Sequence, residues 1–220
     1  MKYLKSCLLA AAIAASGLMA GGCAVTRSEV KLSGQGVEAP QASGGRVVVI
    51  RSVRDERAFE QAPRDPSTPS LGGDGAGSAS AETRSRAIAR KRNSFGQAMG
   101  DVLLEPGKTV EGVVRENLSS ALRKAGYDVR DQGNAGSSPI FIDARIRKFW
   151  AWLTPGFWAV TLRANVETDL AISGGNPAVN VSVTAEQAAM VAGDSAWIEV
   201  IDSALRLYRD QAASKTSGLK

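Results

Sequence analysis

Apolar and polar residues alternate along three segments in the second half of the chain, at residues 140–147, 158–172 and 179–184. A period of two is typical of strands that bury one face and leave the other in water. The Gly-Gly-Asn-Pro sequence at 174–177 predicts a turn between the last two segments. The pattern therefore predicts an antiparallel meander of three strands.

Two other segments repeat apolar residues every three or four positions, which is the period of an amphipathic helix with one buried stripe. The first covers residues 110–125, with Thr109 placed as its N-cap and Gly126 at its end. The second is capped by Asp194, and its apolar stripe continues to Tyr208. Both helices are expected to cover the apolar face of the sheet.

Shorter apolar runs complete the expected sheet. Residues 46–52 form a β-branched run typical of a central strand, residues 84–105 favour an irregular hairpin, and residues 127–129 favour a short strand. Together these elements predict an α+β fold, a two-layer sandwich. Its mixed or antiparallel sheet of about four to six strands is covered on one face by the two helices, and its other face is exposed.

Three stretches have too little apolar surface to offset the entropy of ordering them. Residues 23–45 are predicted to carry a flexible tether, and a Gly/Ser/Pro-rich loop at about 58–83 is predicted to be disordered. Residues 212–220 are predicted to form a flexible tail. The chain is therefore expected to fold as a single domain over residues 46–211.

Residues 1–22 have the layout of a bacterial secretory signal peptide, with a basic start, an apolar run too short to span a bilayer, and small residues at the end. Cys23 follows Ala20-Gly21-Gly22, which resembles the lipobox of bacterial lipoproteins. The resemblance implies that Cys23 becomes an S-diacylglycerol cysteine, is acylated again with palmitate, and anchors the chain in a membrane. Ordinary signal cleavage that leaves a free thiol is the alternative.

The residue after Cys23 is Ala24 rather than aspartate. By resemblance to the sorting rule of Gram-negative lipoproteins, Ala24 implies the outer membrane, with the domain on the periplasmic side. The formal net charge of +5 includes Lys2 and Lys5 of the signal, and the remaining charges of both signs are interspersed. This balance and this compartment do not favour a nucleic-acid partner.

Residue types needed for several kinds of catalysis are missing. The chain has no histidine, and its two cysteines are Cys7 of the signal and Cys23. This excludes Ser-His-Asp and Cys-His systems, HExxH metal sites and cysteine-bound zinc. Ser28 and Lys31 match the SxxK spacing but lie in the predicted tether, and no KTG sequence follows them. No cofactor and no metal are expected.

Five aromatic residues gather around a predicted turn at Pro155-Gly156, and they are Phe149, Trp150, Trp152, Phe157 and Trp158. Alternation places the three tryptophans on the core side of the strands and the two phenylalanines on the wet side. The cluster either plugs the end of the sandwich or forms an exposed contact surface. Exposed aromatic patches mark partner or membrane contacts, and binding of a protein partner is the favoured hypothesis.

Charged residues share the polar face of the meander. Three carboxylates could serve glycan hydrolysis, and they are Asp143, Glu167 and Asp169. Three arginines could bind a small ligand or a glycan, and they are Arg145, Arg147 and Arg163. Cross-strand ion pairs between the two sets are the simpler interpretation. A further basic cluster at 90–92 either contacts anionic lipid headgroups or is solvated.

Three stretches resemble the YajG-type family of bacterial lipoproteins. They are residues 46–55, residues 88–129, which begin IARKRNSFGQAMGDVLLEPGKTV, and residues 142–172, which begin IDARIRKFWAWLTPGFW. The resemblance covers most of residues 46–209 and includes no catalytic signature. It implies a small periplasmic α/β domain, similar in outline to the N-terminal domain of TolB, with no established biochemical activity.

The sequence thus favours a non-catalytic outer-membrane lipoprotein that faces the periplasm. Its expected role is that of an accessory or assembly factor, bound to the membrane through its lipidated N-terminus and to an unidentified envelope protein. A small-ligand or glycan-binding domain is the first alternative. A carboxylate-dependent peptidoglycan hydrolase is the second.

Overall fold

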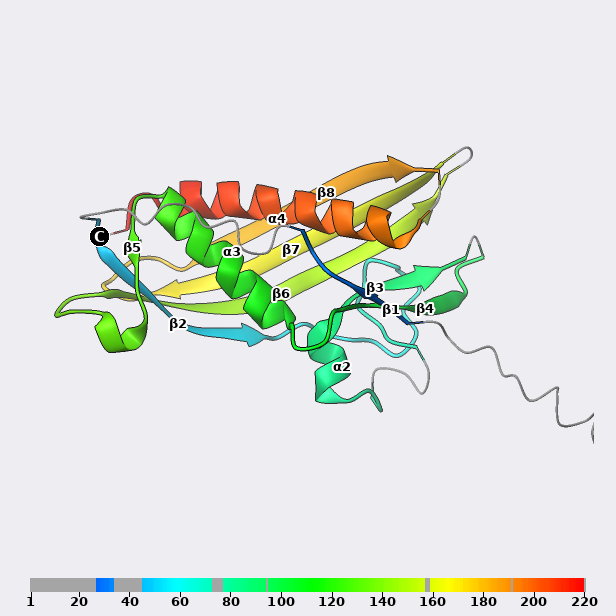
Figure 1. The fold of residues 1–220 in the computed structure, drawn as a ribbon, viewed down its shortest axis with the longest axis horizontal. Coiled ribbons are helices and arrows are strands. Elements are labelled where there is room, and N and C mark those ends of the chain that lie inside the picture. Colours follow the sequence, from blue (N-terminus) through cyan, green and yellow to red (C-terminus); the bar gives the residue numbers. More distant parts are fainter. Residues whose placement is uncertain are drawn as a thin grey trace, which may run out of the picture.

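The computed structural model describes residues 27–33, 45–72, 77–93, 95–156, 159–190 and 192–219. Over these residues the chain forms a mixed α+β fold with one eight-stranded sheet (Figure 1). The strands are β1 (Ser28–Val30), β2 (Val47–Asp55), β3 (Ala87–Arg92), β4 (Ala98–Leu104), β5 (Asp128–Val129), β6 (Ile140–Pro155), β7 (Val160–Ile172) and β8 (Val179–Ala189). The helices are α2 (Ala81–Arg86), α3 (Val110–Lys124), α4 (Asp194–Thr216) and the 3-10 helix η2 (Gln132–Asn134).

Strand β6 organises the sheet. On one of its edges β7 and then β8 follow in antiparallel order, which is the predicted meander. Its other edge is shared, because β2 pairs in parallel with the first half of β6 and β3 pairs with the second half, where Ala89 lies opposite Ala151. β5 continues the sheet from β2, whereas β4 and then β1 continue it from β3. The sheet therefore branches along β6.

The mixed α+β class is as predicted, but the sheet has more strands than the expected four to six. The irregular hairpin is β3–β4. Strand β1 lies within the segment predicted as a tether, and it pairs in parallel with β4, with Ser28 opposite Val102. Val30 and Leu32 are buried. The sequence does not indicate β1 because three residues are too few to show a period, and its partner is distant along the chain.

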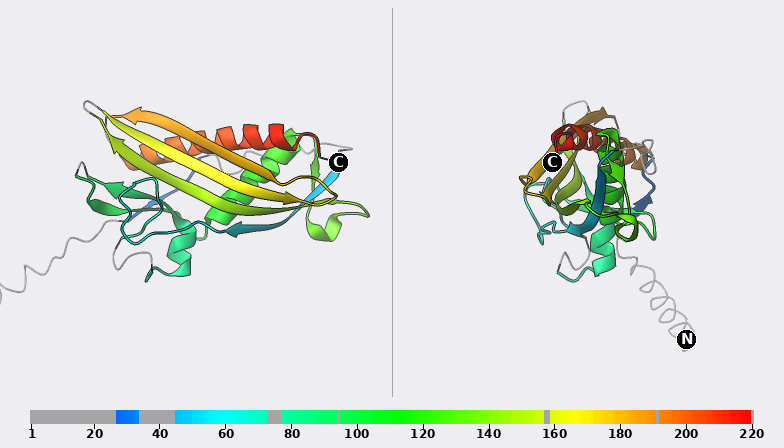
Figure 2. Two further views of the ribbon diagram at one scale, coloured as in Figure 1. Left: turned by 180° about the vertical axis from the view of Figure 1, so that it is seen from behind. Right: turned by 90° about the vertical axis from the view of Figure 1, so that its left-hand side faces the viewer.

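Helices α3 and α4 lie side by side on one face of the sheet (Figures 1 and 2). The Thr109 hydroxyl caps α3 by accepting a hydrogen bond from the Gly112 amide at 3.1 Å. Gly126 follows α3 with a φ of +93°, which glycine adopts without a steric penalty. The apolar faces of both helices belong to one core with the inward side of the sheet. The period of three and four thus predicted both helices correctly.

Helix α4 continues past residue 211, where the sequence predicts a flexible tail. Ala212 and Ala213 are buried, and the Tyr127 hydroxyl donates a hydrogen bond to the Thr216 carbonyl at 2.6 Å. The N-cap of α4 is Gly193 rather than Asp194, and no side chain caps the helix. Alanines add little to a hydrophobic pattern, so the sequence does not reveal how closely this last part of the helix packs.

A β-bulge in β6 reverses the faces of the aromatic residues that follow it. The pairing of β6 with β7 shifts between Ile146 and Lys148, which gives β6 one extra residue. Ile146 points into the helix-covered core before the bulge, and Phe149 points there after it. Phe149 is only 1% exposed, so the prediction that it lies on the wet face is wrong. Trp150 faces the opposite side from that core, again contrary to the prediction.

A second apolar cluster lies on the face opposite α3 and α4. Its buried members are Leu71, Ala87, Leu103 and Trp150, with Phe59, Ala79 and Trp152 packed against them. Over this part of the sheet the face is covered rather than exposed, contrary to the prediction. The sequence alternation does not reveal this because the covering segment comes from a distant, polar part of the chain.

That covering segment belongs to the stretch at about 58–83, which the sequence predicts as a disordered loop. In its described residues, Ser70 and Leu71 are buried, and the Trp150 indole donates a hydrogen bond to the Pro66 carbonyl at 3.2 Å. The Gly72 amide donates to the buried Asp101 carboxylate at 3.0 Å. The segment is ordered with few apolar residues because its backbone forms hydrogen bonds with side chains of the sheet.

Tyr208 of α4 is a fully buried titratable group in the main core. Its hydroxyl lies 3.0 Å from the Thr168 hydroxyl of β7. Burial raises the pKa of Tyr208 from 10.0 to about 12. Because the folded state holds this proton more tightly, the stability that Tyr208 contributes is fully present below pH 10 and is lost as the pH rises through about 12.

We therefore expect the stability difference between the wild type and Tyr208→Phe to change across this pH range. Phenylalanine cannot ionise, so the wild type loses on the order of 2 kcal/mol relative to the variant as the pH rises from 9 to 12. Urea unfolding at a series of pH values measures this difference. Thr168→Val, which keeps the tyrosine, should retain the wild-type pH dependence. A wild-type-to-phenylalanine difference that stays constant with pH would contradict the assignment.

Candidate functional site

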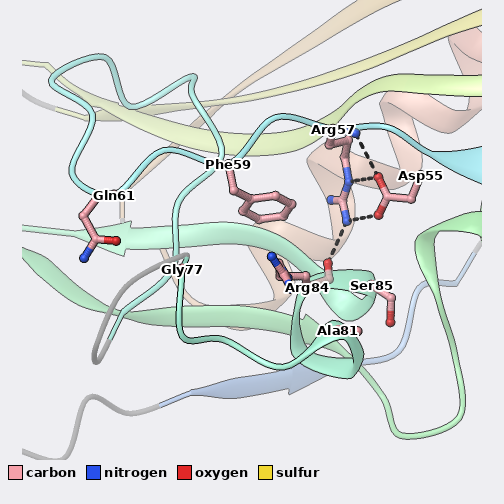
Figure 3. A pocket seen from close by; sticks show the side chains of 8 residues that line it. All are labelled: Asp55, Arg57, Phe59, Gln61, Gly77, Ala81, Arg84 and Ser85. Atoms are coloured by element: carbon pink, nitrogen blue, oxygen red, sulfur yellow. Dashed lines mark hydrogen bonds and ion pairs between the residues drawn. The ribbon is translucent and has the colours of Figure 1, made fainter.

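The guanidinium of Arg57 occupies the point where the sheet branches (Figure 3). Its side chain is fully buried, and its Nε and Nη2 donate to the Asp55 carboxylate at 2.8 and 2.7 Å. Its Nη1 donates to the carbonyls of Ala87 and Phe149 at 2.6 and 3.0 Å, and Nη2 also donates to the Arg84 carbonyl at 2.8 Å. Arg57 therefore joins the end of β2, the α2–β3 junction and β6.

A cavity of about 590 Å³ opens beside this arginine. It is lined by Asp55, Arg57, Phe59, Gln61, Gly77, Ala81, Arg84 and Ser85. The Arg57 guanidinium lies 5.1 Å from the centroid of the Phe59 ring, a cation–π distance. The walls thus combine the aromatic ring of Phe59, the arginine whose donors are engaged within the fold (Arg57), and polar side chains.

The carboxylate and the hydroxyl that line the cavity are already engaged in hydrogen bonds. Arg57 engages both oxygens of Asp55, so this carboxylate is not available as a base. The Ser85 hydroxyl donates to the Glu82 carbonyl at 2.8 Å within α2. Arg84 is exposed and forms no salt bridge with a carboxylate in the described part of the chain. Its guanidinium can therefore bind an anionic group of a ligand or partner.

The polar face of the meander carries ion pairs between the predicted charged residues and their neighbours. Arg147 lies 2.8 Å from Asp169 and 2.8 Å from Glu56, and Arg163 lies 2.7 Å from Glu186. These pairs connect β6 to β7 and to the end of β2, and β7 to β8. The simpler sequence interpretation, cross-strand ion pairing between the two sets, describes Arg147 and Asp169 correctly, whereas Arg163 pairs with Glu186, which is not among the predicted carboxylates.

Two carboxylates of this face, Asp143 and Asp169, are held in their charged form. A hydrogen bond from Arg51 lowers the pKa of Asp143, and hydrogen bonds from Asn180 and then Arg147 lower the pKa of Asp169. A general acid for glycan hydrolysis needs a raised pKa so that it carries a proton at neutral pH. The pKa values of Asp143 and Asp169 are lowered instead of raised, which is the opposite of this requirement.

Two of the predicted residues of this face form no salt bridge with a described residue. Arg145 is exposed and lies opposite Asp169 in the β6–β7 register. Glu167 accepts only a long hydrogen bond, 3.4 Å, from the Asn180 side chain. The three predicted ligand-binding arginines therefore share a face, but two of them, Arg147 and Arg163, already form ion pairs with neighbouring carboxylates.

The predicted aromatic contact surface is not assembled as expected. Phe149 and Trp150 are buried on opposite faces of β6. Trp152 is half-buried, and Lys148 Nζ lies 5.8 Å from its ring centroid. Phe157, Trp158 and the predicted lipidation site Cys23 lie outside the described residues.

A second cavity, which the sequence did not indicate, lies beside α3 and β5. It measures about 520 Å³ and is lined by Ile50, Arg115, Ser119, Arg123, Val129, Arg130, Asp131 and Asn134. Arg115 donates to the Ile50 carbonyl at 2.7 Å, and Arg130 is paired with Asp128. The Nε of Arg123 is buried and has no hydrogen-bond partner among the described residues. Arginines at positions 115 and 123 are two helical turns apart, which is the only signal of this cluster in the sequence.

Within the described residues, no three His, Cys, Asp or Glu side chains lie close enough together to bind a metal ion. None of the described helices has the length and apolarity needed to cross a membrane.

Comparisons with known proteins give no identity. No protein-family model and no curated protein matches the chain. Among solved structures, an uncharacterised protein is similar at 12% identity and a TM-score of 0.42, over 86% of this chain and 95% of that one. Protein XCC0632 from Xanthomonas campestris, of family DUF330, is similar at 12% identity and a TM-score of 0.43, over 87% and 94%. TM-scores this low support no argument about function, and the YajG-type resemblance stays a prediction.

We expect Arg57→Lys to lower the free energy of unfolding by at least about 2 kcal/mol. A lysine keeps the charge but cannot reach the carboxylate and the three carbonyls at once, so buried acceptors lose their donors. Arg84→Lys is the matched control, because that side chain is exposed and should change stability by less than about 0.5 kcal/mol. Urea unfolding measures both variants. Equal stabilities for Arg57→Lys and the wild type would contradict a structural role for Arg57.

Proposed function

We propose that the protein is a non-catalytic lipoprotein of the outer membrane that faces the periplasm and acts as an accessory factor for another envelope component. The observation that carries the proposal is the short distance along the chain between Cys23 and the sheet. Strand β1 begins at Ser28, five residues after Cys23. Five residues span at most about 18 Å, so a lipid on Cys23 would hold the domain directly beside the bilayer.

Because β1 covers Ser28–Val30, the part of the predicted tether (residues 23–45) that comes before the sheet is only residues 23–27. Glu29 of β1 also pairs with the largely buried Arg86 of α2, so β1 is joined to the domain by a side chain as well as by the sheet. A chain anchored at Cys23 therefore could not move its domain far from the membrane. The YajG-type resemblance is consistent with a lipid-anchored location.

The charged groups of the domain support a binding role rather than a catalytic one. The Asp55 carboxylate is saturated by Arg57, and the carboxyl pKa values of Asp143 and Asp169 are lowered. The chain has no histidine to act as a base. What the structure offers instead is the cavity beside Phe59 and Arg84, where a partner could place an acidic group.

The lipid anchor is tested on the full-length protein expressed in a Gram-negative host. We expect mass spectrometry to find a triacylated Cys23 as the N-terminus, and cell fractionation to place the protein in the outer membrane. Cys23→Ala should remove the lipid and eliminate stable association with the outer membrane. Wild-type protein that lacks the lipid, or is released in soluble form, would contradict the proposal.

The same cells can report on the partner. A photocrosslinkable residue in place of Arg84 is expected to give a discrete protein adduct, whereas one in place of Lys124, an exposed residue of α3, serves as the control. Adducts that are identical at both positions, or none at Arg84, would contradict a partner site at this cavity.

A small-ligand function is the second candidate, and the buried Nε of Arg123, which has no hydrogen-bond partner among the described residues, favours it. With Arg115 and Arg130 on the same cavity wall, the ligand class would be a carboxylate or phosphate anion. We expect inorganic phosphate to bind in calorimetric titration and Arg123→Gln to weaken that binding by about tenfold or more. Absence of phosphate binding to the wild type would argue against this candidate.

A further inference from the structure

The strand pairing directs the N-terminal part of the chain toward one end of the domain. β1 and β4 are parallel, with Ser28 opposite Val102. Going backward along both strands from this pair leads to Met99 at the start of β4 and then to the β3–β4 turn. In Figure 1, β1 begins in the half of the molecule that holds this hairpin and the last residues of β8. Cys23 is thus connected to this end and not to the end that holds β5 and η2.

Exposed apolar side chains gather at the same end. Among the described residues, the large hydrophobic side chains with high exposure are Phe95, Met99, Met190 and Leu207. Phe95 belongs to the β3–β4 turn and is 88% exposed, Met99 lies at the start of β4, and Met190 directly follows β8. Only Leu207, on α4, lies elsewhere. These three side chains, here called the apolar edge, expose apolar surface to water at one end of the domain, which is unfavourable.

The turn that carries Phe95 is held by its own hydrogen bonds. The Asn93 side-chain oxygen accepts from the amides of Phe95 and Gln97 at 3.0 and 2.9 Å. The backbone amide of Asn93 donates to the Gln97 carbonyl at 2.9 Å, and Gly96 has a φ of +80°. The turn therefore keeps its shape without any packing of the Phe95 ring. Phe95 is 88% exposed and belongs to neither apolar cluster of the described residues, so its ring can enter another environment.

Positive charges accompany the apolar edge. Arg92 donates to the carbonyls of Gly96 and Pro63 at 3.1 and 3.3 Å, and Arg64 is exposed on the adjoining loop. Neither arginine forms a salt bridge with a described carboxylate. Lys91 differs, because it is paired with Asp194 at 3.0 Å. Arginines without acidic partners next to exposed apolar side chains are typical of surfaces that contact anionic phospholipid.

We propose that this end of the domain, formed by Phe95, Met99, Met190, Arg64 and Arg92, docks on the phospholipid leaflet that holds the anchor. The inference rests on the proposed lipidation of Cys23. That lipid would keep Ser28, the first residue of β1, within about 18 Å of the headgroups, so the local concentration of bilayer near this end is high and a weak contact is sufficient. A protein partner would first have to displace this permanent neighbour.

The test uses the full-length lipidated protein in vesicles of phosphatidylethanolamine, phosphatidylglycerol and cardiolipin. The mature chain has no free thiol once Cys7 is removed with the signal and Cys23 carries its thioether. A single cysteine at Phe95→Cys can therefore carry an environment-sensitive fluorophore. Gly133→Cys in η2 is the matched control, because it lies at the far end and a side chain there meets open space.

The expected result is that lipids spin-labelled near the headgroup quench the fluorophore at position 95 by roughly half or more and leave the one at 133 unchanged. A second probe at Met190→Cys should be quenched as well. Adding Met99→Ser and Arg92→Gln to the Met190→Cys protein should reduce that quenching, and circular dichroism checks that this variant is folded.

The outcomes separate this inference from the proposed function. Equal, weak quenching at 95 and 133, in protein that floats with the vesicles and has a triacylated Cys23, would overturn the docking and leave the anchor intact. Protein without a lipid on Cys23 would overturn both. Protection of position 95 by a crosslinked protein in cells, without quenching by lipid, would overturn the docking in favour of a protein contact.

Discussion

The buried guanidinium of Arg57 is the contact on which the rest of the sheet depends. A sheet that branches along β6 leaves backbone carbonyls at the branch that neither β2 nor β3 can pair. Unpaired buried carbonyls are costly, and Arg57 supplies donors to those of Ala87 and Phe149. The charge of Arg57 is balanced by Asp55. A single side chain therefore supplies the hydrogen bonds that the backbone lacks where the sheet branches.

The β-bulge in β6 works together with this branch. By adding one residue before Phe149, it moves that ring into the helix-covered core and sends Trp150 to the other face. A buried tryptophan on that face requires a cover, which the segment with Phe59 and Leu71 provides. Arg57 lies at the start of this covering segment and stacks on Phe59. The branch, the bulge and the covering segment therefore form one connected arrangement.

The regular elements could be predicted from the sequence because each is long enough to show its own period. Helix α3, helix α4 and the β6–β8 meander all belong to this group. The other elements depend on partners that are distant along the chain. Strand β1 has only three residues, and the covering segment is mostly polar. The bulge in β6 exchanges the faces on which the residues after it lie. None of these features leaves a periodic signal.

The same distinction applies to the candidate site. The ion pair between Arg147 and Asp169 follows from strand alternation, so the sequence indicated it, whereas the partner of Arg163, Glu186, lies beyond the alternating segment. Arg57 stands within a run of four charged residues at 54–57, yet it is fully buried. Arg115 and Arg123 meet Arg130 only once α3 packs beside β5. Contacts made by the tertiary fold, rather than by local pattern, place these arginines.

The central claim is that the sheet begins so close to the anchor that one end of the domain rests on the membrane. Neutron reflectometry of the full-length lipoprotein on a supported bilayer tests this claim most directly. If this end rests on the membrane, protein density begins at the headgroups with no distinct water layer between them. A protein layer separated from the headgroups by a distinct water layer would contradict this contact.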